Sequence, residues 1–279
     1  MVLAGPPSAL KYAVRRAIAA AEHSGKKRQE KIALFTTLVI MRGKWGDFLD
    51  IFDILGPVMI GPSSSHTAGA ARIGAIGRAL LREEVAKAQI FLHGSFAETG
   101  IGHGTDRALV GGLLGMKPDD LRLPNAFEEA RKAGLSYEIA TIDLKAAHPN
   151  TAKLVLRGKE GGTLTLQASS LGGGRIVVTQ LDGVDVSFTG ACPTLIVRNR
   201  DKHGSVAAVT QLLDQLRVNV ATMSVCRDRR GGEALMVIET DQRLEAQQVQ
   251  ALGGLKNILS VTYYDKEDED GPGFNEGNL

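Results

Sequence analysis

Residues 61–69, Gly-Pro-Ser-Ser-Ser-His-Thr-Ala-Gly, form the densest run of chemically capable side chains in the sequence. Small and apolar residues follow at helical spacing, which predicts a helix from Thr67 to Glu84 with the run at its N-terminus. Free backbone N–H groups and the positive end of the helix dipole favour an anion there, such as a carboxylate. A histidine such as His66 is able to move protons near neutral pH, and the dipole is expected to favour its neutral, basic form. The run therefore predicts an anion site with its own base; the simpler alternative is that one serine caps the helix and the others face water.

A second polar cluster lies at residues 94–106, after a predicted strand at residues 88–94. We expect a glycine-rich loop over residues 100–104, which holds His103 between two glycines, and then a helix that begins at Thr105. A histidine in such a loop does not lie on the apolar face of a helix, so it is less suited to a core position. It is a second candidate site residue, unless the cluster only forms a turn that Thr105 or the next residue, Asp106, caps.

A third cluster, Ser-Ser-Leu-Gly-Gly-Gly-Arg at residues 169–175, lies between two predicted strands. Backbone N–H groups of Gly172, Gly173 and Gly174 can line an anion site, and a flexible hairpin is the alternative. The remaining histidines have no companions at metal-ligand spacing and no Cys-x-x-Cys is present, so we expect no metal site wholly within this chain. Neither a P-loop nor a dinucleotide-binding fingerprint occurs.

The composition is that of an ordinary globular protein. The formal net charge of the 279 residues is +2, which is too small to indicate a nucleic-acid-binding protein. No run of eighteen apolar residues is present, and the first residues lack the order of a secretory signal. The two cysteines, Cys192 and Cys226, suit a reducing compartment. We therefore expect a cytoplasmic protein that binds neither nucleic acid nor a membrane.

The length exceeds that of one compact domain, and the sequence pattern divides into four segments. Residues 1–45 form a basic extension without a motif, and a translation start at Met41 would explain it. Residues 46–190 mix helices and strands, and residues 193–265 follow the order βαββαβ of a ferredoxin-like unit. Residues 266–279 are acidic and glycine-rich, which is typical of a disordered tail. The predicted class is α+β, a mixed α/β domain followed by a ferredoxin-like domain.

These motifs resemble those of the beta chain of iron–sulfur-dependent bacterial L-serine dehydratases (L-serine ammonia-lyases). Residues 48–74 are similar to the signature of that family, and residues 94–109 are similar to its second motif. Residues 170–174 match a loop of the allosteric substrate-binding (ASB) domain that some phosphoglycerate dehydrogenases share, and residues 193–265 resemble an ACT domain. The resemblance covers residues 46–265 and implies an ASB-type domain followed by an ACT domain.

The resemblance implies that the chain is one subunit of a lyase that converts L-serine to pyruvate and ammonia. In that family a [4Fe-4S] cluster with one iron free of protein thiolate takes the hydroxyl group as a Lewis acid, and a base removes the α-proton. Such a cluster needs at least three cysteines, and this chain has only two, Cys192 between the predicted domains and Cys226 in the second. The cluster ligands are therefore expected from an alpha chain, which is the implied partner. Homodimerisation through the ASB or the ACT domain is also expected.

Carried over onto this sequence, the resemblance makes His66 and His103 the active-site histidines. The sequence does not decide which of them is the base, and we hypothesise His66 because its polar cluster is denser. The residues expected to bind substrate or shape the pocket are Ser63, Ser64, Ser65, Thr67, Thr105 and Asp106. The residues expected to bind an effector are Gly172, Gly173, Gly174, Asp201 and Gly204. His203 stands where the ACT pattern commonly has proline, so the ligand loop departs from the pattern at this position. The roles expected for the ACT domain are dimerisation or serine sensing.

Two other functions compete with this interpretation. A non-catalytic regulatory module, made of the ASB and ACT domains, would bind an anion at the serine cluster but would not need His66 or His103. A dehydratase that uses pyridoxal phosphate would need a lysine for the Schiff base in a phosphate-binding context. Neither histidine motif contains a lysine, which argues against the second competitor.

Overall fold

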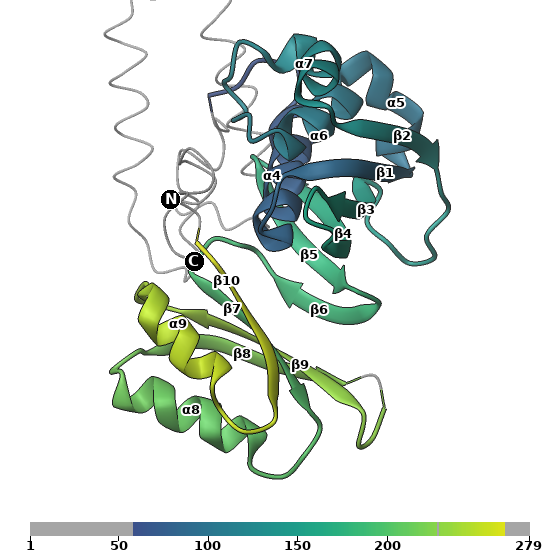
Figure 1. Cartoon of the computed structure of the whole chain (residues 1–279). Coiled ribbons are helices and arrows are strands. Elements are labelled where there is room, and N and C mark those ends of the chain that lie inside the picture. The colour runs from purple at the N-terminus through teal and green to yellow at the C-terminus, as the bar shows by residue number, and fades with distance from the viewer. Residues whose placement is uncertain (1–57, 228, 266–279) are drawn as a thin grey trace, which may run out of the picture. The chain divides into compact units, whose positions relative to one another are not determined.

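The computed structural model describes residues 58–227 and 229–265, all of which belong to one compact unit that begins at Leu55. Two sheets and their helices make up this part of the chain (Figure 1). The predicted α+β class is confirmed, with a mixed α/β domain first and a βαββαβ domain second. The expected N-terminal extension, the start at Met41 and the acidic tail lie outside the described residues.

The first domain contains a six-stranded sheet of order β2-β1-β3-β4-β5-β6. β1 pairs with β2 in parallel, and every other neighbouring pair is antiparallel. Buried and more exposed residues alternate along β3, as expected for a strand with one face in the core. In chain order the elements are η1 (Ser64–Gly69), α4 (Ala70–Leu81), β1 (Val85–His93), α5 (Ser95–His103), α6 (Thr105–Leu113), η2 (Leu123–Asn125), α7 (Ala126–Ala133), β2 (Ser136–Thr141), β3 (Thr151–Gly158), β4 (Thr163–Gly172), β5 (Arg175–Leu181) and β6 (Val184–Phe188).

Helices α4 and α6 touch backbone to backbone. A Cβ atom on Gly74 would lie 2.3 Å from the carbonyl oxygen of Leu109, and a Cβ atom on Gly112 would lie 2.0 Å from the carbonyl oxygen of Ala71. Only glycine leaves room for this approach, which is what the small residues along α4 predict. The contact fixes the helix that follows the first motif against the helix that follows the second.

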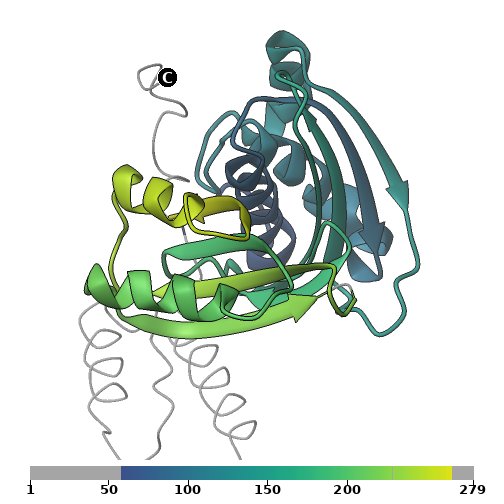
Figure 2. The same cartoon turned by 60° about the horizontal axis from the view of Figure 1, so that its bottom comes forward.

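The second domain has a four-stranded antiparallel sheet of order β10-β7-β9-β8. Its helices α8 and α9 lie on one face of the sheet (Figure 2), where Leu195, Val197 and Met236 form a core with them. The opposite face contributes Ile196 and Tyr264 to the core of the first domain. The elements are β7 (Thr194–Arg200), α8 (Ser205–Gln215), β8 (Val220–Arg227), β9 (Glu233–Thr240), α9 (Ala246–Gly253) and β10 (Ile258–Tyr264).

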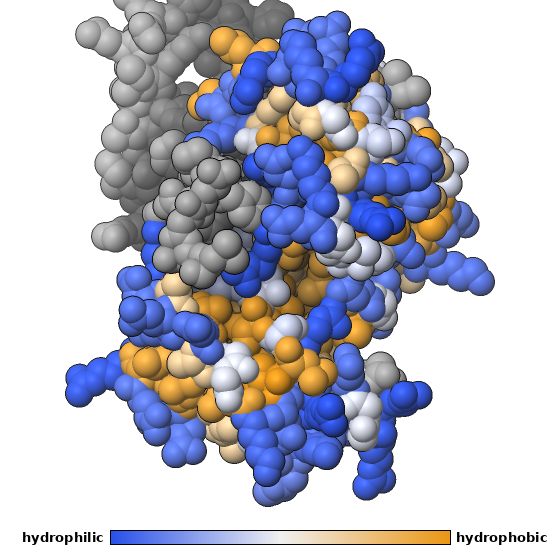
Figure 3. Space-filling view, viewed as in Figure 1, coloured by the Kyte–Doolittle hydropathy of each residue, from blue (hydrophilic) through white to orange (hydrophobic). Residues whose placement is uncertain are grey.

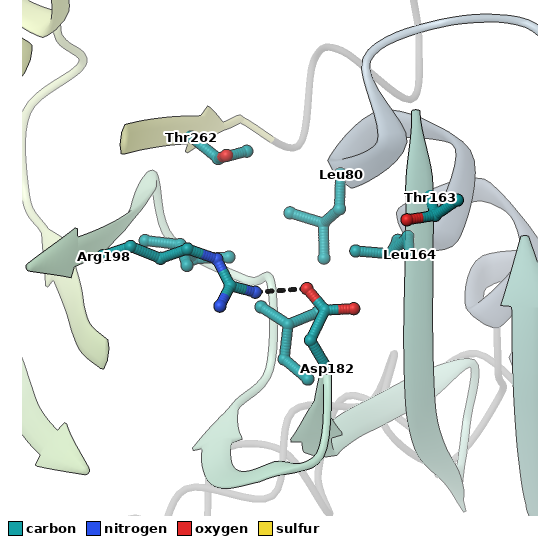
Figure 4. Close-up of a pocket in the computed structure, with 8 residues that line it drawn as sticks. Leu80, Thr163, Leu164, Asp182, Arg198 and Thr262 are labelled. Atoms are coloured by element: carbon teal, nitrogen blue, oxygen red, sulfur yellow. Dashed lines mark hydrogen bonds and ion pairs between the residues drawn. The ribbon is translucent and has the colours of Figure 1, made fainter. Parts of the chain in front are cut away.

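A small cavity lies where the two sheets and α4 meet, lined among others by Leu80, Thr163 and Thr262. Asp182 and Arg198 point toward one another there, and Nη2 of Arg198 donates a hydrogen bond to the carboxylate of Asp182 (Figure 4). This ion pair joins the β5–β6 turn of the first domain to β7 of the second.

Two local expectations were wrong. Residues 100–104 were expected to form a glycine-rich loop, but residues 95–103 form the helix α5. Gly94 and Gly104, both with positive φ, flank this helix at its two ends. The glycines between them have helical backbone. The helix expected from Thr67 begins earlier, at Ser64, with a π-helical turn, and ends at Leu81 because Arg82 takes the left-handed conformation.

Candidate active site

Ser63 begins the helical segment that carries the first motif. It is the N-cap residue, with extended backbone (φ −142°, ψ 124°), and its Oγ accepts a hydrogen bond of 3.1 Å from the backbone N–H of His66. The capping role that competed with a chemical role is therefore real for this one serine. The following turn, Ser64–Gly69, is π-helical, a geometry that is frequent at functional sites.

The imidazole of His66 is held on both sides by hydroxyl groups. Its Nε2 lies 3.2 Å from Oγ of Ser95 and 3.0 Å from Oγ1 of Thr99, and its Nδ1 lies 3.4 Å from Oγ of Ser63. The ring also packs edge-on against Phe96, with centroids 5.2 Å apart, and the Phe96 side chain is fully buried. The ring of His66 is thus fixed in position and orientation.

His103 brings the second motif to the same place. It is the last residue of α5, and its ring centroid lies 5.0 Å from that of His66. The buried side chain of Thr67 donates a hydrogen bond of 3.2 Å to the backbone carbonyl of His103. The structure therefore brings the two histidines expected in the active site together, and Thr67 ties their two segments to each other.

Burial lowers the pKa of His66 below the ordinary histidine value, and the nearby charge of His103 lowers it further. A hydrogen bond with the backbone of Ser95 acts in the opposite direction but does not reverse the shift. His66 is therefore neutral at pH 7, which is the form that accepts a proton.

The third motif also meets the first. The backbone N–H of Gly173 donates to Oγ of Ser64 over 3.4 Å, and Nη1 of Arg72 donates to the carbonyl of Gly174 over 3.0 Å. A Cβ on Gly172 would lie 3.6 Å from Oγ of Ser65. Gly172, Gly173 and Gly174 all have positive φ, which explains the glycine run. The β4–β5 turn therefore lies against the helical segment that carries the first motif.

The other expected residues have different surroundings. Thr105 is fully buried, and within the described residues its Oγ1 has no hydrogen-bond partner. Asp106 accepts a hydrogen bond from the backbone N–H of Arg107 at the start of α6. These two residues follow His103 by two and three positions, so they lie near it in the chain.

Asp201 and Gly204 lie in the second domain and are not part of the histidine site. The carboxylate of Asp201 accepts hydrogen bonds from the backbone of Gly231 and from Arg227, and these two contacts lower its pKa. Gly204 has positive φ and precedes α8. Asp201 therefore ties the β7–α8 loop to the β8–β9 hairpin.

Ser95 and Thr99 are site residues that the sequence motifs did not single out. Both lie inside the second motif, but the expected loop hid their relationship, because a helix makes residues four apart direct neighbours on one face. The hydrogen bond of 2.9 Å from Oγ1 of Thr99 to the carbonyl of Ser95 shows this helical relationship directly.

The described residues do not provide an iron–sulfur site. Among them, no three His, Cys, Asp or Glu side chains are grouped closely enough to hold a metal ion. Cys192 and Cys226 are both free thiols, one before β7 and one on β8. A cluster that needs at least three cysteines does not fit this donor set.

No helix in the described part of the chain is long and apolar enough to span a membrane.

Comparison with known proteins agrees with the motifs. The model of the family described as "Serine dehydratase beta chain" matches residues 48–140, and the ACT domain model matches residues 193–256. The probable L-serine dehydratase beta chain of Bacillus subtilis is 44% identical over 215 residues, which cover 77% of this chain and 97% of that protein. The L-serine dehydratase beta chain of Peptoniphilus asaccharolyticus is 35% identical over 213 residues, covering 76% and 96%.

A more distant similarity connects the chain to another enzyme. D-3-phosphoglycerate dehydrogenase of Bacillus subtilis is 27% identical over 199 residues, which cover 70% of this chain and 37% of that enzyme. The two beta chains match at higher identity and over nearly their whole length. The chain with the paired histidines of residues 66 and 103 therefore belongs to the serine dehydratase beta chain family.

Proposed function

We propose that this chain is the beta subunit of an L-serine dehydratase, which forms pyruvate and ammonia from L-serine at an active site completed by an alpha chain. The observation that carries the proposal is the contact between His66 and His103, whose ring centroids are 5.0 Å apart although they come from separate motifs. A neutral imidazole in a half-buried hydroxyl cluster is equipped for proton transfer from a substrate carbon. Burial lowers the pKa of His66, which keeps the imidazole in this neutral form.

In this proposal the serine cluster binds the substrate carboxylate and His66 removes the α-proton. Ser64 and Ser65 lie in the turn that leads into α4, where backbone N–H groups and the helix dipole favour an anion. His66 lies in the same turn, so a carboxylate bound there brings the adjacent α-carbon toward the imidazole. Loss of the hydroxyl group as water then gives aminoacrylate, which tautomerises and hydrolyses to pyruvate and ammonia.

The implied cofactor belongs to the partner in this proposal. When bound, a [4Fe-4S] cluster supplies a Lewis acid for the departing hydroxyl group. This chain's own residues then bind the carboxylate, orient the substrate and hold the proton. Thr99 and Gly102 are exposed beside the histidines, so this side of the site is open to a partner surface.

We also propose that the chain is cytoplasmic and forms a homodimer. Hydrophobic surface gathers over the second domain in the view of Figure 3. The exposed large apolar side chains of that domain are Val206, Val225 and Leu259. Apolar surface of this kind marks sites of protein–protein contact, which supports self-association through the ACT domain.

The competing function, a regulatory module, is favoured by one observation. The glycine turn that is expected to bind an effector contacts Ser64, so ligand binding there would reach the first motif. In that case the histidines would be dispensable for turnover. The test below therefore separates the two functions.

The experiment is anaerobic co-expression of this chain with its candidate alpha chain, followed by an assay of pyruvate formed from L-serine. His66→Ala and His103→Ala are the test variants, and His148→Gln, an exposed histidine outside the site, is the matched control. Activity only in the pair, lost in both test variants and kept in the control, supports the proposal. Activity that survives both test variants would leave this chain a regulatory role.

A further inference from the structure

The hydroxyl group of Thr99 has one proton to donate, and a carbonyl of its own helix lies within reach as the acceptor. Oγ1 donates this proton to the backbone carbonyl of Ser95 over 2.9 Å. Threonine side chains in helices commonly make this hydrogen bond to the carbonyl four residues earlier. The same oxygen lies 3.0 Å from Nε2 of His66. If Nε2 carried no proton, its lone pair would face the lone pairs of this oxygen. The imidazole therefore donates Nε2–H to Oγ1 of Thr99.

The second hydroxyl at Nε2 is compatible with the same arrangement. Oγ of Ser95 lies 3.2 Å from this nitrogen and accepts from an N–H as readily as it donates. Nε2–H is thus shared between two acceptor oxygens on one face of α5, at positions 95 and 99. A neutral imidazole that carries its proton on Nε2 has its lone pair on Nδ1.

The surroundings of Nδ1 match a lone pair. Oγ of Ser63 accepts the backbone N–H of His66, so the hydroxyl proton of Ser63 is free to point at Nδ1, 3.4 Å away. When Nδ1 takes up a proton, the hydroxyl of Ser63 turns and becomes the acceptor. Both protonation states of His66 therefore keep a partner at each ring nitrogen.

We propose that Thr99 is a positioning residue that holds His66 in the Nε2–H tautomer, and that Nδ1 is the atom that accepts the substrate proton. The tautomer follows from the contacts of this chain alone, whereas the role of Nδ1 rests on the proposed function. In the transfer, the C–H bond electrons stay with the substrate carbon and the proton forms the new Nδ1–H bond. The low pKa of His66 agrees with a neutral ring before the transfer.

The tautomer is measured by ¹⁵N nuclear magnetic resonance on the full chain labelled at histidine, with the His66 signals assigned by their loss in His66→Gln. Two-bond and three-bond couplings from the ring nitrogens to the ring C–H protons separate Nε2–H from Nδ1–H imidazoles. Wild type is expected to show Nε2–H, and a predominant Nδ1–H form of His66 in wild type overturns the proposal without any variant.

Thr99→Val removes the hydroxyl while keeping the shape, and Thr99→Ser restores it. We expect the Nε2–H form to be lost as the single species in Thr99→Val and retained in Thr99→Ser. Thr210→Val is the matched control, because Thr210 is also on a helix and donates to the carbonyl of Val206 four residues earlier, but far from His66. A tautomer that is unchanged in Thr99→Val overturns the role of Thr99.

Kinetics of the complex with the alpha chain test the role of Nδ1. Thr99→Val is expected to lower kcat by about tenfold or more with KM little changed, because fewer molecules hold the reactive tautomer. Thr99→Ser and Thr210→Val should stay near wild type. An Nε2–H tautomer together with full activity of His66→Ala would retain the tautomer assignment but reject the proposed function.

Discussion

The side chain of Thr67 donates a hydrogen bond of 3.2 Å to the backbone carbonyl of His103 and is itself almost wholly buried. This contact joins the turn that carries His66 to the helix that ends at His103. The imidazole pair is therefore held by the backbone of two motifs as well as by its own side-chain contacts.

Protonation of His66 is expected to destabilise the fold. The folded protein binds this proton more weakly than the unfolded chain does, because burial lowers the pKa of His66. The stabilisation from keeping the ring neutral is complete above the unfolded-state pKa of about 6.5 and is lost as the pH falls through the folded-state pKa. Urea unfolding between pH 7.5 and pH 5, in steps of about half a unit, should show this fall in wild type and less of it in His66→Gln. Identical curves for both proteins would contradict the assignment.

The α4–α6 contact predicts a severe effect of one methyl group. Gly112→Ala places a Cβ 2.0 Å from the carbonyl oxygen of Ala71, and backbone cannot rotate out of the way as a side chain can. We expect the free energy of unfolding to fall by about 2–3 kcal/mol. Gly253→Ala, also at a helical glycine but with open space around it, is the control and should be neutral or slightly stabilising. Equal stability of the two variants would show that the helices can separate at no cost.

Two adjacent glutamates are expected to differ sharply in their contribution to stability. Glu83 is buried, and its carboxylate accepts hydrogen bonds from the backbone N–H groups of Glu160 and Gly162 in the β3–β4 turn. Glu84 is exposed and pairs with Lys159 on the surface. Glu83→Ala should cost about 2 kcal/mol because it leaves backbone donors unpaired, whereas Glu84→Ala should cost less than about 1 kcal/mol. Chemical denaturation of both variants measures this difference.

The ion pair of Asp182 and Arg198 is expected to be weak, while Asp182 itself is important for the turn. Both side chains are about 30% exposed, at 31% and 29%. A double-mutant cycle with Asp182→Asn and Arg198→Met should give a coupling below about 1 kcal/mol. Asp182→Ala should destabilise more than Asp182→Asn. Asp182 has a φ of 46° and accepts the backbone N–H of Thr165, and asparagine tolerates both requirements. An alanine variant as stable as the asparagine variant would contradict this account.

Much of the fold was predictable because local sequence and tertiary structure agree. The ferredoxin-like order of residues 193–265 follows from alternating apolar residues and turn signals, and the structure has the elements in that order. The strand β6, in contrast, was missed. Asp182-Gly183 is the dipeptide typical of a two-residue hairpin turn, and both residues have positive φ. The signal for this strand was therefore present in the sequence.

The three polar clusters could be named from the sequence, but the contacts between them and the roles of Ser95 and Thr99 beside His66 could not. Glycine and serine types indicated three polar turns, yet no local pattern tells which turns meet in space. The contact of His66 with His103 depends on the packing of α4 on α6, which is a tertiary effect. The positions of Ser95 and Thr99 depended on α5, where the glycines at positions 100 and 102 suggested a loop. Helical glycines are unfavourable by about 1 kcal/mol each in isolation, and tertiary packing outweighs that preference here.

The hydrogen bond between Thr67 and His103 also bears on how the proposed complex with an alpha chain would be assembled. Because one buried hydroxyl joins the two motifs, the two imidazoles have a defined mutual geometry within this chain alone. A partner then needs one rigid alignment rather than two, and the loss of conformational entropy on docking is correspondingly smaller. The half-site is in this sense preassembled, and encounter with the partner selects an orientation without having to create one.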